Sequence, residues 1–448
     1  MDDIYKENQV SRRQFLKYTA AVSAATAGAG WLAGCALNPV TGEKQLMMVS
    51  REQEIGIDKN QSPFQFSSDY GVTQDSRVNY YVADIGKKVV PYVHRKDMPY
   101  NFQCVNAVYV NAYAFPGGTI AVTRGILLKL DNEAQLAALL GHELGHVNAR
   151  HSAQQMSKGQ LSSLLVGGLA MAAGSRSSDL GDLTQQLGAL GQGLLLSKYS
   201  RDNEREADEL GNEYMVRSGY STTGFVDLME ILNSLHKEAA SSVQVLFSTH
   251  PMSSERLESA RERGNGRYAK SKTLPLNRDR YMDSIASLRQ KEKGIVLLQQ
   301  GEKSMGAKEY DKAQHSFQEA LKSMDDDYTA HVLMAKCMMA RKNPRQALVH
   351  SQNAQQLYPM EAQGYQVAGD ANLSLKRWAD AYREYDKCED LLPGNPHLKF
   401  LKGYCQDKNG QIKPAAQNYA DYLKVTNYAP NQYSKFAYSR LKTWGYAK

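Results

Sequence analysis

Three polar residues near the middle of the chain have the types and spacing of a metal site. The segment "GHELGHVNAR" places His142 and His146 four residues apart, with Glu143 beside the first. In a helix, residues four apart point the same way, so both imidazoles can bind one ion. Glu143 is offset by about 100°, so its carboxylate can reach a water molecule on that ion without becoming a ligand. This is the HExxH arrangement of zinc proteases. The alternative is three polar residues on the wet face of a helix.

A second acidic segment could complete the site. We expect a second helix in "SKYSRDNEREADELGNEYM", with Glu204 and Asp208 four residues apart. Catalytic zinc usually has three protein ligands and one water, so Glu204 can be the third ligand. Asp208 can accept a hydrogen bond from a ligating imidazole. Read alone, the segment would be an acidic helix surface.

A different third ligand is excluded by the residues that follow the HExxH motif. The metzincin pattern needs glycine at 149 and histidine at 152, where the chain has Ala149 and Ser152. His151 lies nine residues after His142, on another face of the helix, and we interpret it as a surface residue. One zinc ion per chain would acidify its water and polarise a peptide carbonyl, while Glu143 moves the proton to the leaving amine.

The elements around these residues can also be predicted. Asp131 or Asn132 is the expected N-cap of a helix that runs to about Arg150. The stretch "GGTIAVTRG" alternates like a strand. Between the two motif helices, the apolar piece 161–173 is too short and too rich in serine and glycine to span a bilayer. We expect helices over the cleft there.

Several separated motifs resemble the HtpX and Ste-type zinc metallopeptidases. "HELGH" followed by "EREAD" matches their HExxH plus ExxxD signature, and "NAYAFPGGTIAVTRGIL" matches their strand before the helix. "NPVTGEKQLMMVS" and "STHPMSSERL" resemble the soluble bacterial branch, so the resemblance covers roughly 36–265. It implies that His142, His146 and Glu204 are ligands and that Glu143 is the base. It also implies that the strand borders the cleft, where a substrate could pair along it.

The resemblance gives His250 a role as well. Its setting, "FSTHPM", predicts a loop, since Pro251 disfavours helix at His250. In the resembling periplasmic members, a histidine in this context can occupy the open position on zinc as a plug. The alternatives are oxyanion stabilisation and a plain exposed loop residue.

The first residues look like an export signal rather than part of the fold. Arg12 and Arg13 precede a small apolar stretch, which resembles a twin-arginine signal; an ordinary secretory signal and a membrane anchor are the alternatives. "LAGC" ends at Cys35 and resembles a lipobox, whose cysteine is lipidated. Residue 36 is alanine, which by analogy with enteric lipoproteins favours the outer membrane.

Five cysteines remain to be explained, an odd count for an exported protein. Lipidation of Cys35 would leave four, and no CxxC pair suggests a thiolate zinc site. Cys337, Cys388 and Cys405 are interpreted as small packing residues, with a Cys388–Cys405 disulfide as the alternative. The net charge of +7 is spread along the chain without long basic runs, which gives no support for nucleic-acid binding.

The C-terminal half repeats every 34 residues. Alanines recur at 313, 347, 381 and 415, and small residues at 301, 335, 369 and 403. Aromatic residues follow at 317, 385 and 419, with Ser351 breaking the set. This period resembles the tetratricopeptide repeat, an antiparallel helix pair that stacks into a solenoid for protein binding. A generic array of helical hairpins is the alternative.

These inferences predict an α+β fold, in which a mainly helical zincin-type domain with a small sheet precedes an α-solenoid. The expected divisions are a twin-arginine-type lipoprotein signal peptide (1–35), a zinc metallopeptidase domain (36–270), a linker and leading helix (271–293), about four repeats (294–429), and a tail or capping helix (430–448).

The function expected by resemblance to BepA-type proteases is a periplasmic zinc endopeptidase, lipid-anchored to the outer membrane. It would cleave misfolded or stalled outer-membrane proteins, and its repeats would recruit substrate or assembly machinery. The alternatives are a chaperone-like adaptor with a latent, plugged protease site, and a maturation protease for one partner.

Overall fold

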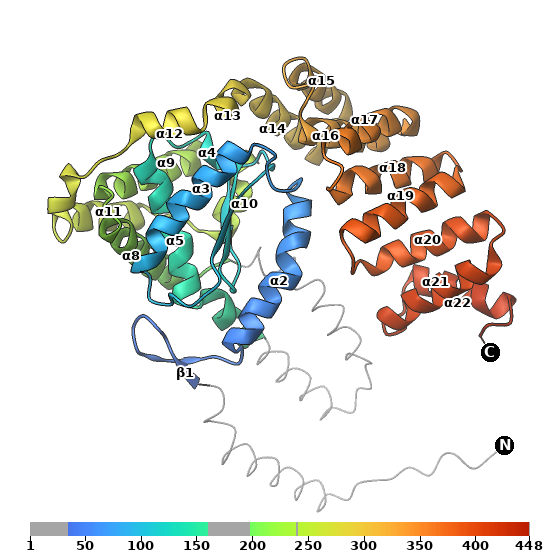
Figure 1. Cartoon of the computed structure of the whole chain (residues 1–448), viewed down its shortest axis with the longest axis horizontal. Helices are drawn as coiled ribbons and strands as arrows, with labels where there is room; N and C mark the ends of the chain where they lie inside the picture. Colours follow the sequence, from blue (N-terminus) through green and yellow to red (C-terminus); the bar gives the residue numbers. More distant parts are fainter. Residues whose placement is uncertain (1–34, 160–197, 239–240, 448) are drawn as a thin grey trace, which may run out of the picture.

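The computed structural model describes residues 35–159, 198–238 and 241–447. It contains a mainly helical N-terminal domain with a small sheet, followed by an arc of helical hairpins, which lies on the right in Figure 1. The predicted fold class is therefore confirmed. Among the described residues, no helix combines the length and apolar character needed to cross a membrane. The predicted helices over the cleft at 160–197 and the signal segment 1–34 lie outside the described residues.

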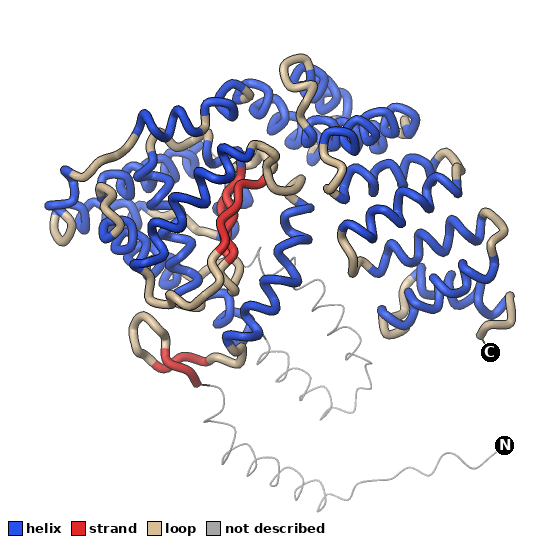
Figure 2. Tube along the Cα trace, viewed as in Figure 1, coloured by secondary structure: helices blue, strands red, loops and turns tan. Residues whose placement is uncertain are grey.

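The N-terminal domain begins with a hairpin and is built around a three-stranded sheet (Figure 2). The hairpin pairs β1 (Cys35–Leu37) with β2 (Lys44–Leu46), and the sheet has the order β3-β5-β4. β3 runs parallel to β5, and β4 runs antiparallel to it. The strands are β3 (Asn101–Val105), β4 (Ala112–Ala114) and β5 (Thr119–Thr123).

Helices cover this sheet and carry the predicted metal ligands. They are α2 (Arg51–Ser68), α3 (Ser76–Val89), the short η1 (Val90–Tyr92), α4 (Arg124–Leu127), α5 (Glu133–Asn148), α8 (Arg201–Arg217), α9 (Thr222–Glu238), η2 (Ser241–Val243), α10 (Gln244–Thr249) and α11 (Ser254–Asn265). A connector of η3 (Ala269–Thr273), α12 (Arg278–Ser284) and α13 (Ala286–Gln290) leads to the solenoid.

The solenoid consists of four helical hairpins and a final helix. Its helices are α14 (Glu292–Gly306), α15 (Tyr310–Leu321), α16 (Tyr328–Ala340), α17 (Pro344–Leu357), α18 (Ala362–Ser374), α19 (Trp378–Leu391), α20 (Pro396–Lys408), α21 (Ile412–Val425) and α22 (Gln432–Thr443). The turn inside each hairpin has a left-handed residue, and these recur every 34 positions at Lys308, Lys342, Lys376 and Gly410. The sequence period is therefore also a period of backbone conformation.

Small and aromatic residues pack against each other inside these hairpins. A side chain on Gly301 or Gly369 would collide with the buried ring of Phe317 or Tyr385, respectively, sixteen residues later. The second hairpin has Ser351 at the corresponding aromatic position, where the small column has Ala335. Cys104, Cys337, Cys388 and Cys405 are buried free thiols, so the alternative of a Cys388–Cys405 disulfide is wrong.

The solenoid packs directly on the N-terminal domain. One continuous apolar core extends from Tyr70 to Ala371. Polar contacts cross the boundary as well: Arg124 and Asp327 form a buried ion pair, and the Tyr70 hydroxyl donates to Glu302. The first hairpins are therefore packed directly against the N-terminal domain.

Candidate metal centre

Helices α5 and α8 position most of the candidate site residues. The side chain of Asn132 accepts from the backbone of Gln135 and caps α5, as one of the two predicted N-caps. Every residue of α5 is buried, so the alternative of polar residues on a wet helix face is wrong. Ser200 and Asn203 cap α8 reciprocally, which fixes where the helix begins and places Glu204 in its first turn.

Glycines let these two helices approach closely enough to share a site. A Cβ atom on Gly141 would lie 2.8 Å from the carbonyl oxygen of Gly211, and one on Gly145 would lie 2.9 Å from the Cα of Ala207. A larger residue at either position would force the helices apart. The glycines of "GHELGH" therefore bring ligands from two helices to one point.

The candidate ligand atoms converge. His142 Nε2 lies 3.1 Å from His146 Nε2, and Glu204 Oε1 lies 3.4 Å from His146 Nε2. Together with His250, these residues place one ligand atom each within 4.8 Å of one another. All four are buried, with at most 6% of each residue exposed. The structure thus brings together every ligand that the sequence suggested.

The remaining predicted residues surround this cluster. Asp208 Oδ1 lies 3.0 Å from His142 Nδ1, on the side of the ring that faces away from the cluster. Glu143 is buried, and its Oε2 has no hydrogen-bond partner among the described residues. Burial raises the pKa of Glu143, as expected for a carboxyl group that exchanges protons.

Arg256 is a site residue that the sequence reasoning missed. Its guanidinium lies 2.6 Å from Glu204 Oε2 and donates to both carboxylate oxygens of Asp208 at 2.7 and 2.8 Å. Burial opposes ionisation of both carboxyl groups, but Arg256 holds the pKa of Glu204 well below its usual value and that of Asp208 at about 2. Arg256 lies in the motif "STHPMSSERL", and that motif is the feature of the sequence that could have identified it as a site residue.

The residue types fit a divalent cation. Two imidazoles and a carboxylate are the donor set of catalytic zinc sites. Glu143, Glu204 and Asp208 bring three buried carboxylates, against one guanidinium from Arg256. If all are ionised, two negative charges remain, which one divalent cation would balance.

His250 lies inside this cluster rather than on an exposed loop. It follows α10 directly, with non-helical backbone before Pro251 as expected. Its Nδ1 lies 3.1 Å from Glu204 Oε1 and 3.5 Å from His142 Nε2. Burial opposes protonation, but the carboxylates of Glu204 and Glu143 raise the pKa of His250.

Two sequence interpretations need correction. His151 is fully buried and contacts His146, so it is not a surface residue. β5 is the central strand of the described sheet, with both its edges paired, so a substrate strand cannot add to it. Strand order depends on contacts distant in sequence, which alternation alone does not reveal. The edge strands of the described sheet are β3 and β4.

The ring of Tyr199 stacks on His146, with centroids 3.9 Å apart. Its backbone N–H donates to the carbonyl of Thr249, next to His250. A cavity of about 590 Å³ lies beside this closed cluster, lined by Tyr199, Arg256 and basic residues that include Lys198, Arg201 and Arg205. The ligands are therefore covered in this structure, and the cavity is the open space beside them.

Comparisons with known proteins agree with this site. The family model described as peptidase family M48 matches residues 76–264, and the one described as a TAT (twin-arginine translocation) pathway signal sequence matches 9–29. The HtpX and Ste-type resemblance is a near match to that family.

Two relatives from Escherichia coli (strain K12) illustrate the likeness. The "Beta-barrel assembly-enhancing protease" is 30% identical over 196 residues, which are 43% of this chain and 40% of the relative. The "Metalloprotease LoiP" is 35% identical over 167 residues, or 37% and 63% of the two chains. The chain thus spans about 40% of the length of the first of these relatives.

A solved structure, "Crystal structure of MamA protein", is 17% identical to this chain with a TM-score of 0.32, and covers 35% of this chain and 84% of its own. Because that TM-score is low, the solenoid is described from its own helices and not from this likeness. The candidate metal centre and the family match lie in the same segment. Residues 76–264 therefore match the metallopeptidase domain of peptidase family M48, and they hold the clustered histidines and carboxylates.

Proposed function

We propose that this protein is a zinc endopeptidase of the bacterial periplasm that cleaves misfolded or stalled outer-membrane proteins. The observation that carries the activity is the convergence of His142, His146 and Glu204 beside Glu143, whose Oε2 has no hydrogen-bond partner among the described residues. The substrate class rests on the relative named for β-barrel assembly. The compartment rests on the signal match at 9–29.

Each residue has a defined task in this proposal. His142, His146 and Glu204 would hold zinc, which supplies Lewis acidity toward water and the peptide carbonyl. Glu143 takes a proton from the attacking water and delivers it to the leaving amine, and its raised pKa suits both steps. Asp208 fixes the orientation of His142, and Arg256 keeps Asp208 and Glu204 ionised.

The closed geometry supports a resting state that needs activation. His250 shares the space of the three ligands, and Tyr199 covers His146. We therefore infer that His250 acts as a plug that must leave before a substrate enters. The same observation favours the second candidate function, a chaperone-like adaptor whose protease site is mostly silent.

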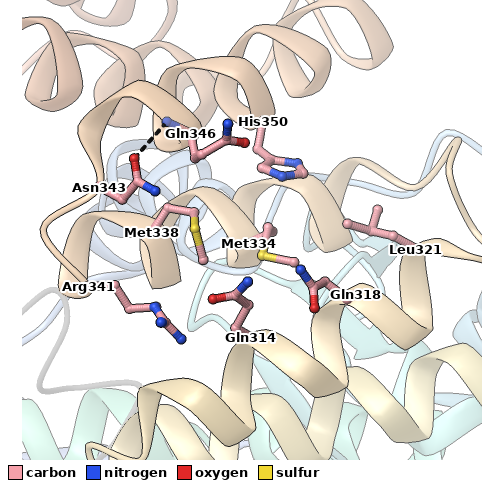
Figure 3. Close-up of a pocket in the computed structure, with 9 residues that line it drawn as sticks. All are labelled: Gln314, Gln318, Leu321, Met334, Met338, Arg341, Asn343, Gln346 and His350. Carbon is pink, nitrogen blue, oxygen red and sulfur yellow. Dashed lines mark hydrogen bonds between the residues drawn. The ribbon is translucent and has the colours of Figure 1, made fainter.

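The solenoid would recruit the substrate or assembly machinery. A pocket of about 510 Å³ lies between α15, α16 and α17 (Figure 3). Figure 3 shows the carboxamides of Gln314 and Gln318 near the thioether of Met334. Carboxamides can hydrogen-bond a peptide backbone, and methionine adapts to varied apolar side chains. This combination suits an unfolded segment without one fixed sequence.

We place the chain on the periplasmic side of the outer membrane, anchored through lipidated Cys35. The proposal rests on the "LAGC" sequence and the alanine after it. Labelling of the wild type, but not of Cys35→Ser, with a fatty-acid analogue in cells would support the anchor; equal labelling would contradict it.

The first experiment uses the chain from residue 36 onward, as wild type and as Glu143→Gln. Bound zinc and cleavage of unfolded casein are measured in both. We expect zinc in both and cleavage in wild type alone, because the substitution removes the base and leaves the ligands in place. Zinc in both without any cleavage would favour the adaptor, and a folded wild type without zinc would refute the ligand assignment.

Replacement of His250 tests the plug. Removal of a competing ligand should raise the competent fraction, so His250→Ala should increase casein cleavage by roughly tenfold or more. The double variant Glu143→Gln/His250→Ala is the matched control for contaminating proteases. Loss of cleavage in His250→Ala would instead indicate the oxyanion role.

A further inference from the structure

The imidazole of His146 contacts a second histidine through the ring nitrogen that does not face the other candidate ligands. Its Nε2 faces Glu204 and His142, whereas its Nδ1 lies 2.9 Å from Nδ1 of His151. His151 has no exposed surface, and it lies in the helical segment 151–159 that follows α5. His142 differs, because its Nδ1 faces the carboxylate of Asp208 directly.

The contacts continue from His151 to a carboxylate. His151 Nε2 lies 3.1 Å from Oε2 of Glu206, a residue of α8 two positions after Glu204. The other oxygen of Glu206 accepts from an amide N–H, and an ionised carboxylate has only acceptors, so Glu206 accepts from His151 as well. His151 then carries its proton on Nε2 and accepts at Nδ1. His146 must donate from its own Nδ1, which leaves its Nε2 lone pair free for a metal.

The far end of this chain of contacts is the N-terminal hairpin, residues 35–46. The side chain of Asn38 donates to Glu206 Oε1 at 2.9 Å. Asn38 is itself buried, and its own side-chain oxygen accepts from the backbone of Val40, which fixes its rotamer in the turn. A separate contact, Met48 N–H to the Ser157 hydroxyl at 2.8 Å, fastens the chain that follows the hairpin to the same helical segment.

We propose that His151, Glu206 and Asn38 form a relay that orients the metal ligand His146, so that the N-terminal hairpin supports the metal centre. The inference rests on the proposed zinc site. All three are positioning residues, since they act through His146. Partners of this kind typically change metal affinity by about 10- to 100-fold when removed. The hairpin begins at Cys35, the predicted lipidation site, so the end of the chain that we propose is anchored is part of the support for the metal centre.

The test measures zinc affinity by competition with a chromogenic chelator, using the Glu143→Gln chain from residue 36 to prevent self-cleavage. His151→Leu removes the acceptor for His146 and should lower zinc affinity by about 10- to 100-fold. His151→Gln can still accept from His146 and donate to Glu206, and should recover most of that loss. Asn38→Leu should weaken zinc binding by less, because Glu206 retains its contact with His151.

Ser157→Ala is the matched control, because it releases Met48 without touching the relay. It should leave zinc affinity unchanged. Thermal unfolding of the zinc-free variants reports their structural cost separately.

Unchanged affinity in His151→Leu would overturn the relay. Equal losses in His151→Leu and His151→Gln, matched by equal losses of zinc-free stability, would also overturn it. A parent chain that binds no zinc would overturn the proposed function together with the relay, whereas zinc in the parent with unaffected variants overturns the relay alone.

Discussion

The buried ion pair between Arg124 and Asp327 should tie the folding of the peptidase domain to that of the solenoid. Arg124 directly follows β5, and Asp327 caps α16 by accepting from the backbone of Ala330. The guanidinium nitrogens lie 2.5 and 3.4 Å from the two carboxylate oxygens. The two side chains are only 6% and 5% exposed, so water cannot replace either partner. Asp327→Asn preserves the size and cap of the side chain but removes its charge.

The expected magnitude follows from this burial. Removal of one partner from a buried pair leaves the other charge unpaired, at a cost of about 3–5 kcal/mol in unfolding free energy. Asp327→Asn and Arg124→Met should each show a loss of this size. The double variant leaves no unpaired charge, so its loss should fall short of the sum by about 2 kcal/mol.

Urea unfolding of the four forms, in the Glu143→Gln background, measures this coupling. Helical circular dichroism follows both domains, since both are mainly helical. In the chain from residue 36, fluorescence of Trp378 and Trp444 follows the solenoid alone. We expect one shared transition in the parent chain and separated transitions in Asp327→Asn. Additive losses, or single losses below about 1 kcal/mol, would refute the reasoning, because they would describe a solvated surface pair.

Two predictions concern the metal cluster. Arg256→Met leaves Glu204 and Asp208 without their guanidinium partner and should lower the unfolding free energy of the zinc-free protein by about 3–5 kcal/mol. Added zinc should restore part of that stability, because it supplies positive charge. Equal losses with and without zinc in urea unfolding would contradict the charge balance. The raised pKa of His250 means that the native zinc-free protein keeps a proton that the unfolded chain has released. Its stabilising effect is complete below about pH 6.5 and is lost as pH rises through the raised value. The thermal midpoint of the zinc-free protein should therefore fall as pH rises over this range. If a His250→Gln variant shows no such fall, the pH dependence is assigned to His250.

Local spacing accounts for what could be predicted from the sequence. The shared faces of His142 with His146, and of Glu204 with Asp208, follow from helical geometry over one turn. α5 begins at one of its two predicted caps, and α8 forms within the second predicted helix. The solenoid followed from a period that recurs in every hairpin. In each case, the information lies within a few residues or in simple repetition.

Long-range contacts account for what could not be predicted. Arg256 is 48 residues from Asp208 in the sequence, and a buried arginine has no local pattern that separates it from a surface one. His151 was predicted to be exposed because we assumed that the helix of α5 continued through it. The helix is instead interrupted at Arg150, which has a left-handed backbone conformation. That break turns His151 back toward His146. The central place of β5 likewise depends on a pairing with β3, which is distant in sequence.

The segment that carries His250 connects the metal cluster to the sheet. The Thr249 carbonyl accepts from the backbone of Tyr199, whose ring covers His146, and the Ser242 carbonyl accepts from Val110, two residues before β4. Val110 therefore contacts one end of this segment, while His250 lies in the cluster at the other. Because α10 is only six residues long, less than two helical turns separate the contact at Ser242 from His250. A shift of the backbone beside β4 should therefore move His250 as well, so the sheet and the metal cluster are coupled through one short segment.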